Sequence, residues 1–316
     1  MKAAVVTAFD QAPRYQEFPT PTPSDPDEAL VEVLAAGLHP RVRSQANGSH
    51  YTSSDQLPLI PGIDGVGRTQ DGTLRYFILP DTNLGAMAER TVIDIRRSVP
   101  LPPDSDPVQV AAAMNPAMSS WLALRSRIDF RPGQRVLVLA ATGNAGRMAV
   151  QVARHLGAGG IVAVGRGADR LTQLGAERTV SLDDDPATIA KNLGEAGSDV
   201  DVVLDYLWGQ ATADALYAIV PQRADDSQAL NWIQIGSVAG TESPIPSAAL
   251  RATNLRILGS GQGSVPTRSI LAELPQLAAE VNQGTFDVQA RSMALADVED
   301  AWTLALTSSE RIVLVP

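Results

Sequence analysis

The chain has 316 residues and none of them is cysteine, which excludes several kinds of site at the outset. Without thiols the protein can form no disulfide, no thiolate zinc site and no iron–sulfur cluster, and it has no cysteine nucleophile. A thiol-based mechanism is therefore excluded. In addition, only three histidines are present, so few side chains remain for metal or acid–base chemistry.

A basic run and a long apolar stretch are also missing. The formal net charge is −10, so the positive surface of a nucleic-acid-binding protein is not expected. The apolar run in Met1–Thr7 is too short for a signal peptide, and no later stretch is long enough to span a bilayer. We therefore expect a cytoplasmic protein that binds neither nucleic acid nor a membrane.

The length and a hydrophobic content of 44% allow a sizeable core, and a chain of this size is expected to form two domains. Its N-terminal part is broken by proline and glycine into short apolar segments such as Met1–Ala8 and Ala29–Ala36. Segments of this kind are typical of β-strands. The first domain is therefore predicted to be rich in β-structure.

From Asp106 onward the pattern changes to helical segments, Val108–Met114 and Ser119–Arg125, followed by alternating strands and helices. Such alternation predicts a doubly wound parallel sheet and a fold of the α/β class. The strands of this sheet are expected at Arg135–Ala140, Ile161–Gly165, Thr179–Leu182, Asp201–Asp205, Trp232–Ile235 and Leu255–Leu258. Beyond them a long helix at Thr267–Gln283 leads to a closing strand at Arg311–Val315.

The most informative segment lies between the first two of these strands. An apolar run ends in the small-residue turn Ala140-x-x-Gly143-x-x-Gly146, and a helical apolar pattern follows. A strand, a tight turn and a helix in this order form a dinucleotide-binding crossover, in which Gly143 lets a pyrophosphate approach and Gly146 lets the helix pack against the strand. The residues predicted to contact the dinucleotide here are Ala140, Thr142, Gly143, Asn144, Ala145 and Gly146.

The end of the next strand indicates which dinucleotide binds. An NAD site needs a carboxylate there to accept from the ribose hydroxyls, but this strand ends in Gly165 and Arg166. A guanidinium can pair with the 2′-phosphate of NADPH, which a carboxylate would repel. Arg170, four positions after Arg166, could add a second cation or face solvent. NADPH is therefore the predicted cofactor.

Short motifs along most of the chain occur in a consistent order and spacing. They include Ala36-Gly37-Leu38-His39-Pro40, Leu59-Ile60-Pro61-Gly62-Ile63-Asp64-Gly65-Val66-Gly67, Gly85-Ala86-Met87-Ala88-Glu89, Asn115-Pro116 and Ile235-Gly236-Ser237. Together with the glycine turn, these motifs resemble the medium-chain dehydrogenase/reductase superfamily, in its zinc-free quinone oxidoreductase (ζ-crystallin-like) branch.

The resemblance implies a GroES-like, β-rich catalytic domain formed by both ends of the chain, with a Rossmann domain between them. The expected boundaries are 1–115 for the first part of the catalytic domain, 116–262 for the NADPH-binding Rossmann domain and 263–316 for the return to the catalytic domain. The resemblance also implies a homodimer, joined at the edge strand near Leu255–Leu258.

The chain departs from the zinc alcohol dehydrogenases of this superfamily. Those enzymes have a cysteine ligand where His39 stands, and a Gly-His-Glu motif where Gly62-Ile63-Asp64 stands. Isoleucine cannot bind metal, and one histidine with one carboxylate falls short of the three protein ligands of a catalytic zinc. No metal site is therefore expected.

The resemblance also places particular residues at the cofactor. His39 falls near the nicotinamide, Ser119 near its carboxamide, and Tyr206, Gly236 and Ser237 in the loops after the fourth and fifth strands. Loops at strand ends line the crevice of any such sheet, so these residues also fit ordinary turns.

Catalysis is expected to depend on few side chains. Ser44 replaces a cleft tyrosine found in several quinone reductases, whereas Tyr51 could donate a hydrogen bond to a substrate oxygen or lie in a surface turn. Ser119, Tyr51 and His39 are the catalytic candidates. Since no histidine is recognisably paired with a carboxylate, positioning and electrostatic stabilisation are expected to carry the reaction.

These features predict an NADPH-dependent enzyme that transfers hydride to small-molecule quinones or α,β-unsaturated carbonyls without zinc, because such acceptors need no metal activation. A zinc-free carbonyl, alcohol or enoyl-thioester reductase is an alternative. So is a redox-silent NADPH-binding protein, because a fold does not determine a function.

Overall fold

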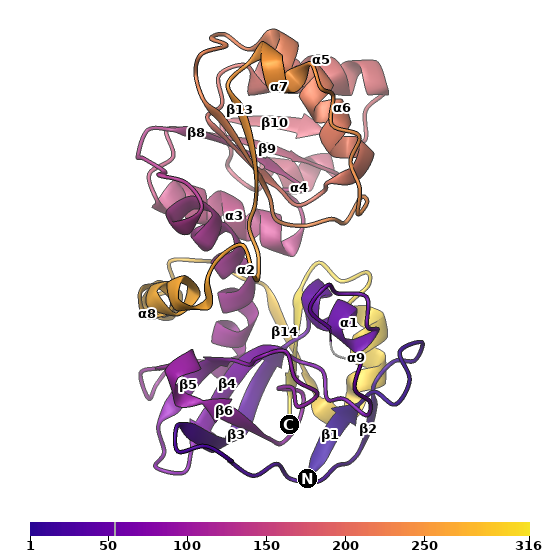
Figure 1. Cartoon of the computed structure of the whole chain (residues 1–316), viewed down its shortest axis with the longest axis vertical. Coiled ribbons are helices and arrows are strands. Elements are labelled where there is room, and N and C mark those ends of the chain that lie inside the picture. Colours follow the sequence, from indigo (N-terminus) through magenta and orange to yellow (C-terminus); the bar gives the residue numbers. More distant parts are fainter. Residues whose placement is uncertain (54) are drawn as a thin grey trace. The chain divides into compact units, whose positions relative to one another are not determined.

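The computed structural model describes residues 1–53 and 55–316, and the chain divides into two compact units (Figure 1). We call Met1–Asn115 with Leu271–Pro316 the terminal unit, and Pro116–Ile270 the central unit. The return to the first unit, expected at residue 263, lies at Leu271. Arg127 holds the intervening segment to the central unit, because its guanidinium donates to the carbonyl oxygens of Gly259 (2.7 Å) and Ser264 (3.1 Å).

The central unit contains a six-stranded sheet in the order β10-β9-β8-β11-β12-β13, and every neighbouring pair is parallel. The strands are β8 (Arg135–Leu139), β9 (Gly160–Gly165), β10 (Arg178–Ser181), β11 (Val202–Asp205), β12 (Leu230–Gln234) and β13 (Leu255–Gly259). In chain order this is 3-2-1-4-5-6, the Rossmann arrangement. The predicted α/β class and its parallel sheet are confirmed.

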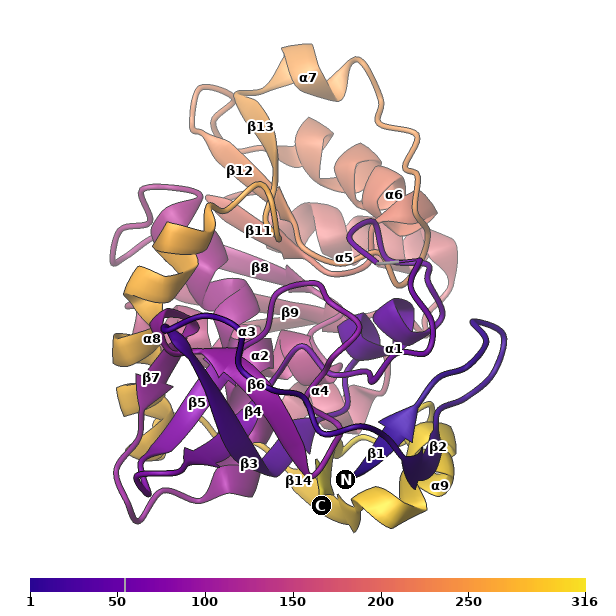
Figure 2. The same cartoon turned by 60° about the horizontal axis from the view of Figure 1, so that its bottom comes forward.

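Helices connect these strands, as parallel pairing requires. They are α3 (Asn144–His155), α4 (Ala168–Thr172), α5 (Pro186–Gly197), α6 (Gly209–Ile219) and α7 (Ala249–Ala252). The core between sheet and helices includes the fully buried side chains of Leu137, Val162, Val203 and Trp232. Figure 2 shows β11, β12 and β13 side by side at one end of the sheet. The order reverses between β8 and β11, and ligands of such sheets bind at the carboxyl ends beside that point.

One long helix, α2 (Pro107–Ser126), replaces the two helices predicted before the sheet. Pro116 lies inside it and removes one intrahelical hydrogen bond. The helix continues through this residue because its side chains are buried on both sides of the proline, as at Met114 and Trp121. Asp106 caps its start by accepting from the backbone of Val108 at 2.8 Å. Burial therefore overrides the local signal of the proline.

The terminal unit is built around a seven-stranded sheet in the order β14-β15-β3-β4-β5-β7, with β6 also paired to β3. The strands are β3 (Glu28–Gly37), β4 (Asp64–Thr69), β5 (Leu74–Ile78), β6 (Arg90–Asp94), β7 (Ser98–Pro100), β14 (Ala290–Ala294) and β15 (Arg311–Val315), beside a hairpin of β1 (Lys2–Val5) and β2 (Arg14–Glu17). Because β15 pairs with β3 at Val313 and Gly37, the C-terminal segment completes a sheet that the N-terminal segment begins.

Further helices belong wholly or largely to this unit: α1 (Pro40–Ala46), α8 (Thr267–Asn282) and α9 (Val298–Leu304). Its core contains Ile60, Phe77, Met87 and Leu314, all almost completely buried. No helix in residues 1–53 or 55–316 is long and apolar enough to cross a membrane.

Candidate cofactor-binding and active site

The glycine turn joins β8 to α3 in a defined conformation. Ala140 adopts a left-handed backbone conformation (φ 64°), and the backbone N–H of Ala141 donates to Val164 of β9 at 2.8 Å. Gly143 is the N-cap of α3, and no side chain of the described residues caps this helix. The first-turn N–H groups of a helix have no acceptor within it, and they lie at the positive end of its dipole. This turn therefore offers donors to an anion.

The glycines of this region differ in how much space there is for a side chain at each position. A Cβ on Gly146 would lie 2.1 Å from the carbonyl oxygen of Ala140, and one on Gly165 would lie 2.9 Å from Oγ1 of Thr142. Both positions are therefore closed by packing. A Cβ on Gly143 would meet only the Ala140 oxygen, at 3.4 Å. Gly143 thus places no side chain in front of the start of α3.

Cationic side chains follow β9, where the adenosine ribose of a dinucleotide lies in this fold. Arg166 is exposed, and Arg170 folds back so that a Cβ on Gly167 would lie 2.7 Å from its Nε. The nearby carboxylate of Asp183, on the loop after β10, accepts from the N–H of Gly167 at 2.7 Å. Sequence reasoning missed this acidic residue because it was sought after the second strand in chain order, β9, whereas Asp183 follows the third strand, β10.

Ser119 and Tyr206 form a pair inside the central unit. The hydroxyl of Ser119 donates to the carbonyl oxygen of Pro116 at 2.8 Å, and the Tyr206 hydroxyl lies 2.9 Å from the same Oγ. Since the Ser119 proton is engaged, Tyr206 is the donor of the second bond. Burial raises the pKa of Tyr206 to about 12, which keeps that proton in place. Ser119 is therefore arranged to accept a further hydrogen bond, such as one from a carboxamide NH2.

Asp205, at the end of β11, holds Tyr206 and the loop that follows. This buried carboxylate accepts four hydrogen bonds: from the backbone of Leu207 (2.8 Å) and Trp208 (3.0 Å), from Thr212 Oγ1 (2.5 Å) and from Trp232 Nε1 (2.8 Å). Its partners lie up to 27 positions away in the sequence. No signal beyond its place at a strand end could have identified this role.

The loop after β12 lies next to the loop after β11. The N–H of Gly236 donates to the backbone oxygen of Asp205 at 3.1 Å, and a Cβ on Gly236 would lie 2.9 Å from the backbone oxygen of Tyr206. Ser237 follows on the surface. The structure therefore brings Tyr206, Gly236 and Ser237 together at the carboxyl edge of the sheet.

The expectation that no histidine pairs with a carboxylate is wrong. His39, the residue before α1, is 3% exposed, and its Nε2 lies 3.1 Å from Oδ1 of Asp64. Tyr76 donates its hydroxyl proton to the other carboxylate oxygen at 2.8 Å. The pair escaped sequence reasoning because its members are 25 positions apart and meet only through the folding of α1 and β4.

Burial and the neighbouring charges together determine the protonation state of His39. Burial lowers the pKa of His39 more than the carboxylate of Asp64 raises it, so the ring is neutral at pH 7 and donates its Nε2 proton to Asp64. Burial also lowers the pKa of the nearby Arg311, to about 10, so this side chain remains a cation coupled to Asp64. Since Nε2 of His39 donates to Asp64, Nδ1 is the ring atom that could accept a hydrogen bond.

Tyr51 lies in a surface turn after α1 and is 72% exposed. Its ring centroid is 4.2 Å from that of His50, and Thr52 accepts from Arg41 at 2.6 Å. Arg41 also forms an ion pair with Asp81. Partial burial raises the pKa of Tyr51, so it stays protonated at neutral pH. This side chain can donate a hydrogen bond, and most of its surface is exposed.

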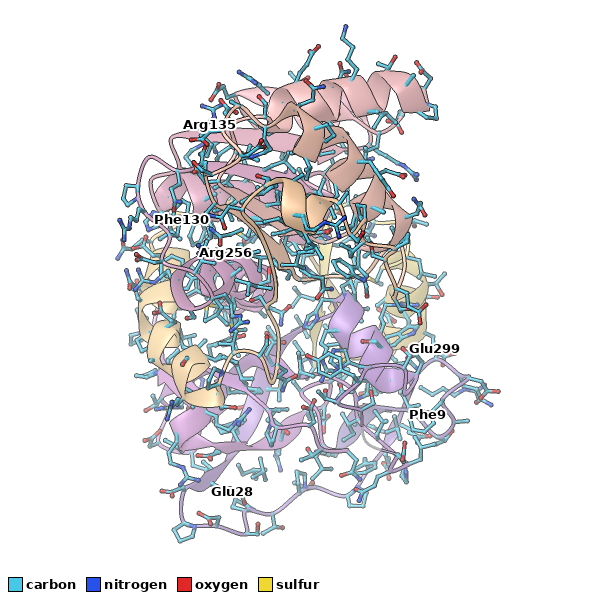
Figure 3. All side chains as sticks on the ribbon, turned by 45° about the horizontal axis from the view of Figure 1, so that its top comes forward. Phe9, Glu28, Phe130, Arg135, Arg256 and Glu299 are labelled. Carbon is cyan, nitrogen blue, oxygen red and sulfur yellow. The ribbon has the colours of Figure 1, made fainter. Side chains whose placement is uncertain are left out.

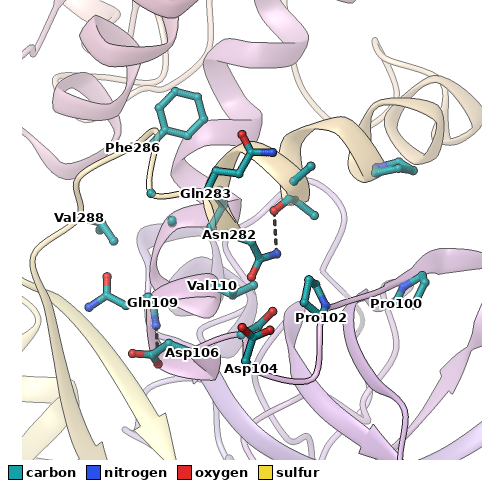
Figure 4. A pocket seen from close by; sticks show the side chains of 17 residues that line it. Pro100, Pro102, Asp104, Asp106, Gln109, Val110, Asn282, Gln283, Phe286 and Val288 are labelled. Atoms are coloured by element: carbon teal, nitrogen blue, oxygen red, sulfur yellow. Dashed lines mark hydrogen bonds between the residues drawn. The ribbon is translucent and has the colours of Figure 1, made fainter.

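The terminal unit also contains a cavity of about 620 Å³ that includes none of the predicted site residues (Figure 4). It lies between the start of α2, near Asp106 and Val110, and the end of α8 with the segment that reaches Phe286. Asp104 and Asp106 contribute negative charge to a wall that mixes apolar residues with the polar side chains of Gln109, Asn282 and Gln283. No metal-binding group of three or more His, Asp or Glu side chains occurs within the part of the chain that the structure describes.

Comparisons with known proteins agree with this geometry. No protein-family model matches the chain. The chain is 32% identical to the probable NADPH-dependent quinone reductase tdiC of Emericella nidulans, with 100% of both proteins covered. It is 25% identical to the quinone oxidoreductase-like protein 2 of Rattus norvegicus, over 82% of this chain and 74% of the relative.

A solved structure is similar over the same length. The quinone oxidoreductase of Thermus thermophilus, also known in complex with NADPH, has a TM-score of 0.77 and 25% identity, with 100% of both chains covered. Similarity of this extent to a named relative and to a solved structure establishes the family. The chain belongs to the quinone oxidoreductases of the medium-chain dehydrogenase/reductase superfamily.

Proposed function

We propose that this protein is an NADPH-dependent oxidoreductase that transfers hydride to quinones or α,β-unsaturated carbonyls without zinc. The observation that carries this proposal is the uncapped start of α3, kept open by Gly143, together with Arg166 at the end of β9 where an NAD site has a carboxylate. The names of the relatives, a probable NADPH-dependent quinone reductase and a quinone oxidoreductase, support the same activity.

The chain's own residues have separate tasks in this proposal. The N–H groups at the start of α3 bind the pyrophosphate, Arg166 and Arg170 bind the 2′-phosphate, and Ser119 accepts from the nicotinamide carboxamide. Bound NADPH supplies the hydride. Tyr51, protonated at neutral pH, is the proposed donor to a substrate oxygen. His39 is neutral and serves as an acceptor through Nδ1 rather than as an acid.

The reaction balances without a metal. A quinone takes one hydride and one proton to become a hydroquinone, and an enone takes the hydride at its β-carbon and a proton from solvent. Zinc is not proposed, because Ile63 stands where the zinc enzymes have a histidine and only His39 and Asp64 remain of the aligned ligand positions.

The fate of the hydride tests the reaction. With NADPH deuterated at the transferable C4 position and an enone acceptor, we expect the label on the β-carbon of the product, measured by mass spectrometry and NMR. A screen with 1,4-benzoquinone, 9,10-phenanthrenequinone and crotonyl thioester then orders the acceptors. Rapid reduction of simple ketones or aldehydes, with no turnover of quinones or enones, would replace this proposal by a zinc-free carbonyl reductase.

Replacement of Arg166 by alanine tests the cofactor. We expect the Kd for NADPH to rise about 10- to 100-fold, because one charge-assisted contact to the 2′-phosphate is lost, while the Kd for NADH stays unchanged. Fluorescence titration with both cofactors measures this. Arg251→Ala, an exposed arginine on α7, is the matched control and should leave both constants unchanged. Equal affinity of the wild type for NADH and NADPH would contradict the assignment.

We further propose a homodimer, because β13 is the edge strand of its sheet in the part of the chain that the structure describes, and its Arg256 side chain is exposed (Figure 3). A second copy of β13 could extend the sheet across a two-fold axis. Location in the cytoplasm stays a prediction from the sequence.

A further inference from the structure

The loop after β10 brings a carboxylate to the cations that follow β9. The two strands are parallel neighbours, with Ser181 opposite Gly165, so their carboxyl ends lie at the same edge of the sheet. Asp183 comes two residues after β10, and its Oδ2 accepts from the N–H of Gly167 at 2.7 Å. Gly167 directly follows Arg166 and has a left-handed backbone (φ 82°).

The charges around Gly167 are not neutralised by contact. Arg166, Arg170 and Asp183 are all exposed, and Arg170 lies against Gly167. Within the described residues, neither arginine forms an ion pair with Asp183, whose carboxylate accepts from the N–H of Gly167 instead. Both guanidinium groups are therefore available to a phosphate, while the carboxylate of Asp183 lies beside them.

We propose that Asp183 is a specificity-determining residue that lowers the preference of this site for NADPH over NADH. The inference rests on the proposed function, in which Arg166 and Arg170 bind the 2′-phosphate. A phosphate dianion at this edge is repelled by the Asp183 carboxylate, which also occupies the N–H of Gly167 that an anion could otherwise use. NADH has no charge at its 2′ position and does not experience this repulsion.

The variant Asp183→Asn separates charge from structure, because its amide oxygen can still accept from Gly167. We expect the Kd for NADPH to fall roughly two- to tenfold at low salt, the Kd for NADH to stay unchanged, and the gain to shrink as ionic strength rises. Asp184→Asn removes the same charge from the next residue, which is also exposed, and should change the NADPH constant less than twofold. Fluorescence titrations of the purified protein measure all these constants.

The titrations distinguish a failure of this inference from a failure of the proposed function. An NADPH constant in Asp183→Asn that is unchanged or larger, or equal gains for both cofactors, overturns this inference while the wild type still binds NADPH through Arg166. A wild type that does not bind NADPH overturns the proposed function and this inference together.

Discussion

Gly146→Ala is expected to destabilise the central unit by about 3 kcal/mol or more and to abolish NADPH binding. The added Cβ would lie 2.1 Å from the carbonyl oxygen of Ala140 and 2.7 Å from the Cα of Ala141, and both are backbone atoms that no side-chain rotation can move. The start of α3 must therefore shift away from β8. Thermal and urea denaturation, with fluorescence titration of NADPH, measure the two effects.

Gly143→Ala is the matched control for this prediction. Its Cβ would meet only the Ala140 oxygen at 3.4 Å, and the backbone of Gly143 (φ −79°, ψ 164°) is open to any residue. We expect stability within about 1 kcal/mol of the wild type, because no native contact is lost, but weaker NADPH binding because the methyl group enters the space for the pyrophosphate. Equal loss of stability in both variants would show that the two glycines do not divide their roles in this way.

Asp64→Ala is expected to lower the free energy of unfolding by about 3–5 kcal/mol, because it leaves a buried cation without its counter-charge. Arg311 is 4% exposed and stays charged at neutral pH, since its pKa is about 10. The hydroxyl of Tyr76 and Nε2 of His39 also lose their acceptor. Urea denaturation followed by circular dichroism measures the loss.

Two further variants make this result specific. Asp104→Ala removes an exposed carboxylate from the same unit and should change stability by less than about 0.5 kcal/mol. Asp64→Asn keeps an acceptor of similar shape but removes the charge, so its loss of stability should approach that of Asp64→Ala if the charge of Arg311 dominates, and should be clearly smaller if the hydrogen bonds from Tyr76 and His39 dominate. A loss as small as that of Asp104→Ala would mean that the buried network contributes little to stability.

Several features of this protein follow from residues that are neighbours in the chain. The crossover from β8 to α3 could be predicted because a strand, a glycine turn and a helix are each specified locally, and Gly146 must be small wherever these elements pack. The sequence also shows directly that Arg166, rather than a carboxylate, follows the end of β9. The order of the six parallel strands then follows from a fold with few possible connections.

Other features depend on which distant segments the fold brings together. The continuity of α2 through Pro116 depends on burial, which outweighs the local preference of proline to interrupt a helix. The four donors to Asp205, the pairing of His39 with Asp64, and the contact of Asp183 with Gly167 join residues from separate strands and loops. A short polar side chain can reach many partners, and only the strand order and register decide which of them lies within about 3 Å. For that reason candidate contacts for a dinucleotide could be predicted from the sequence, whereas the partners of Asp205, His39 and Asp183 emerged only from the folded chain.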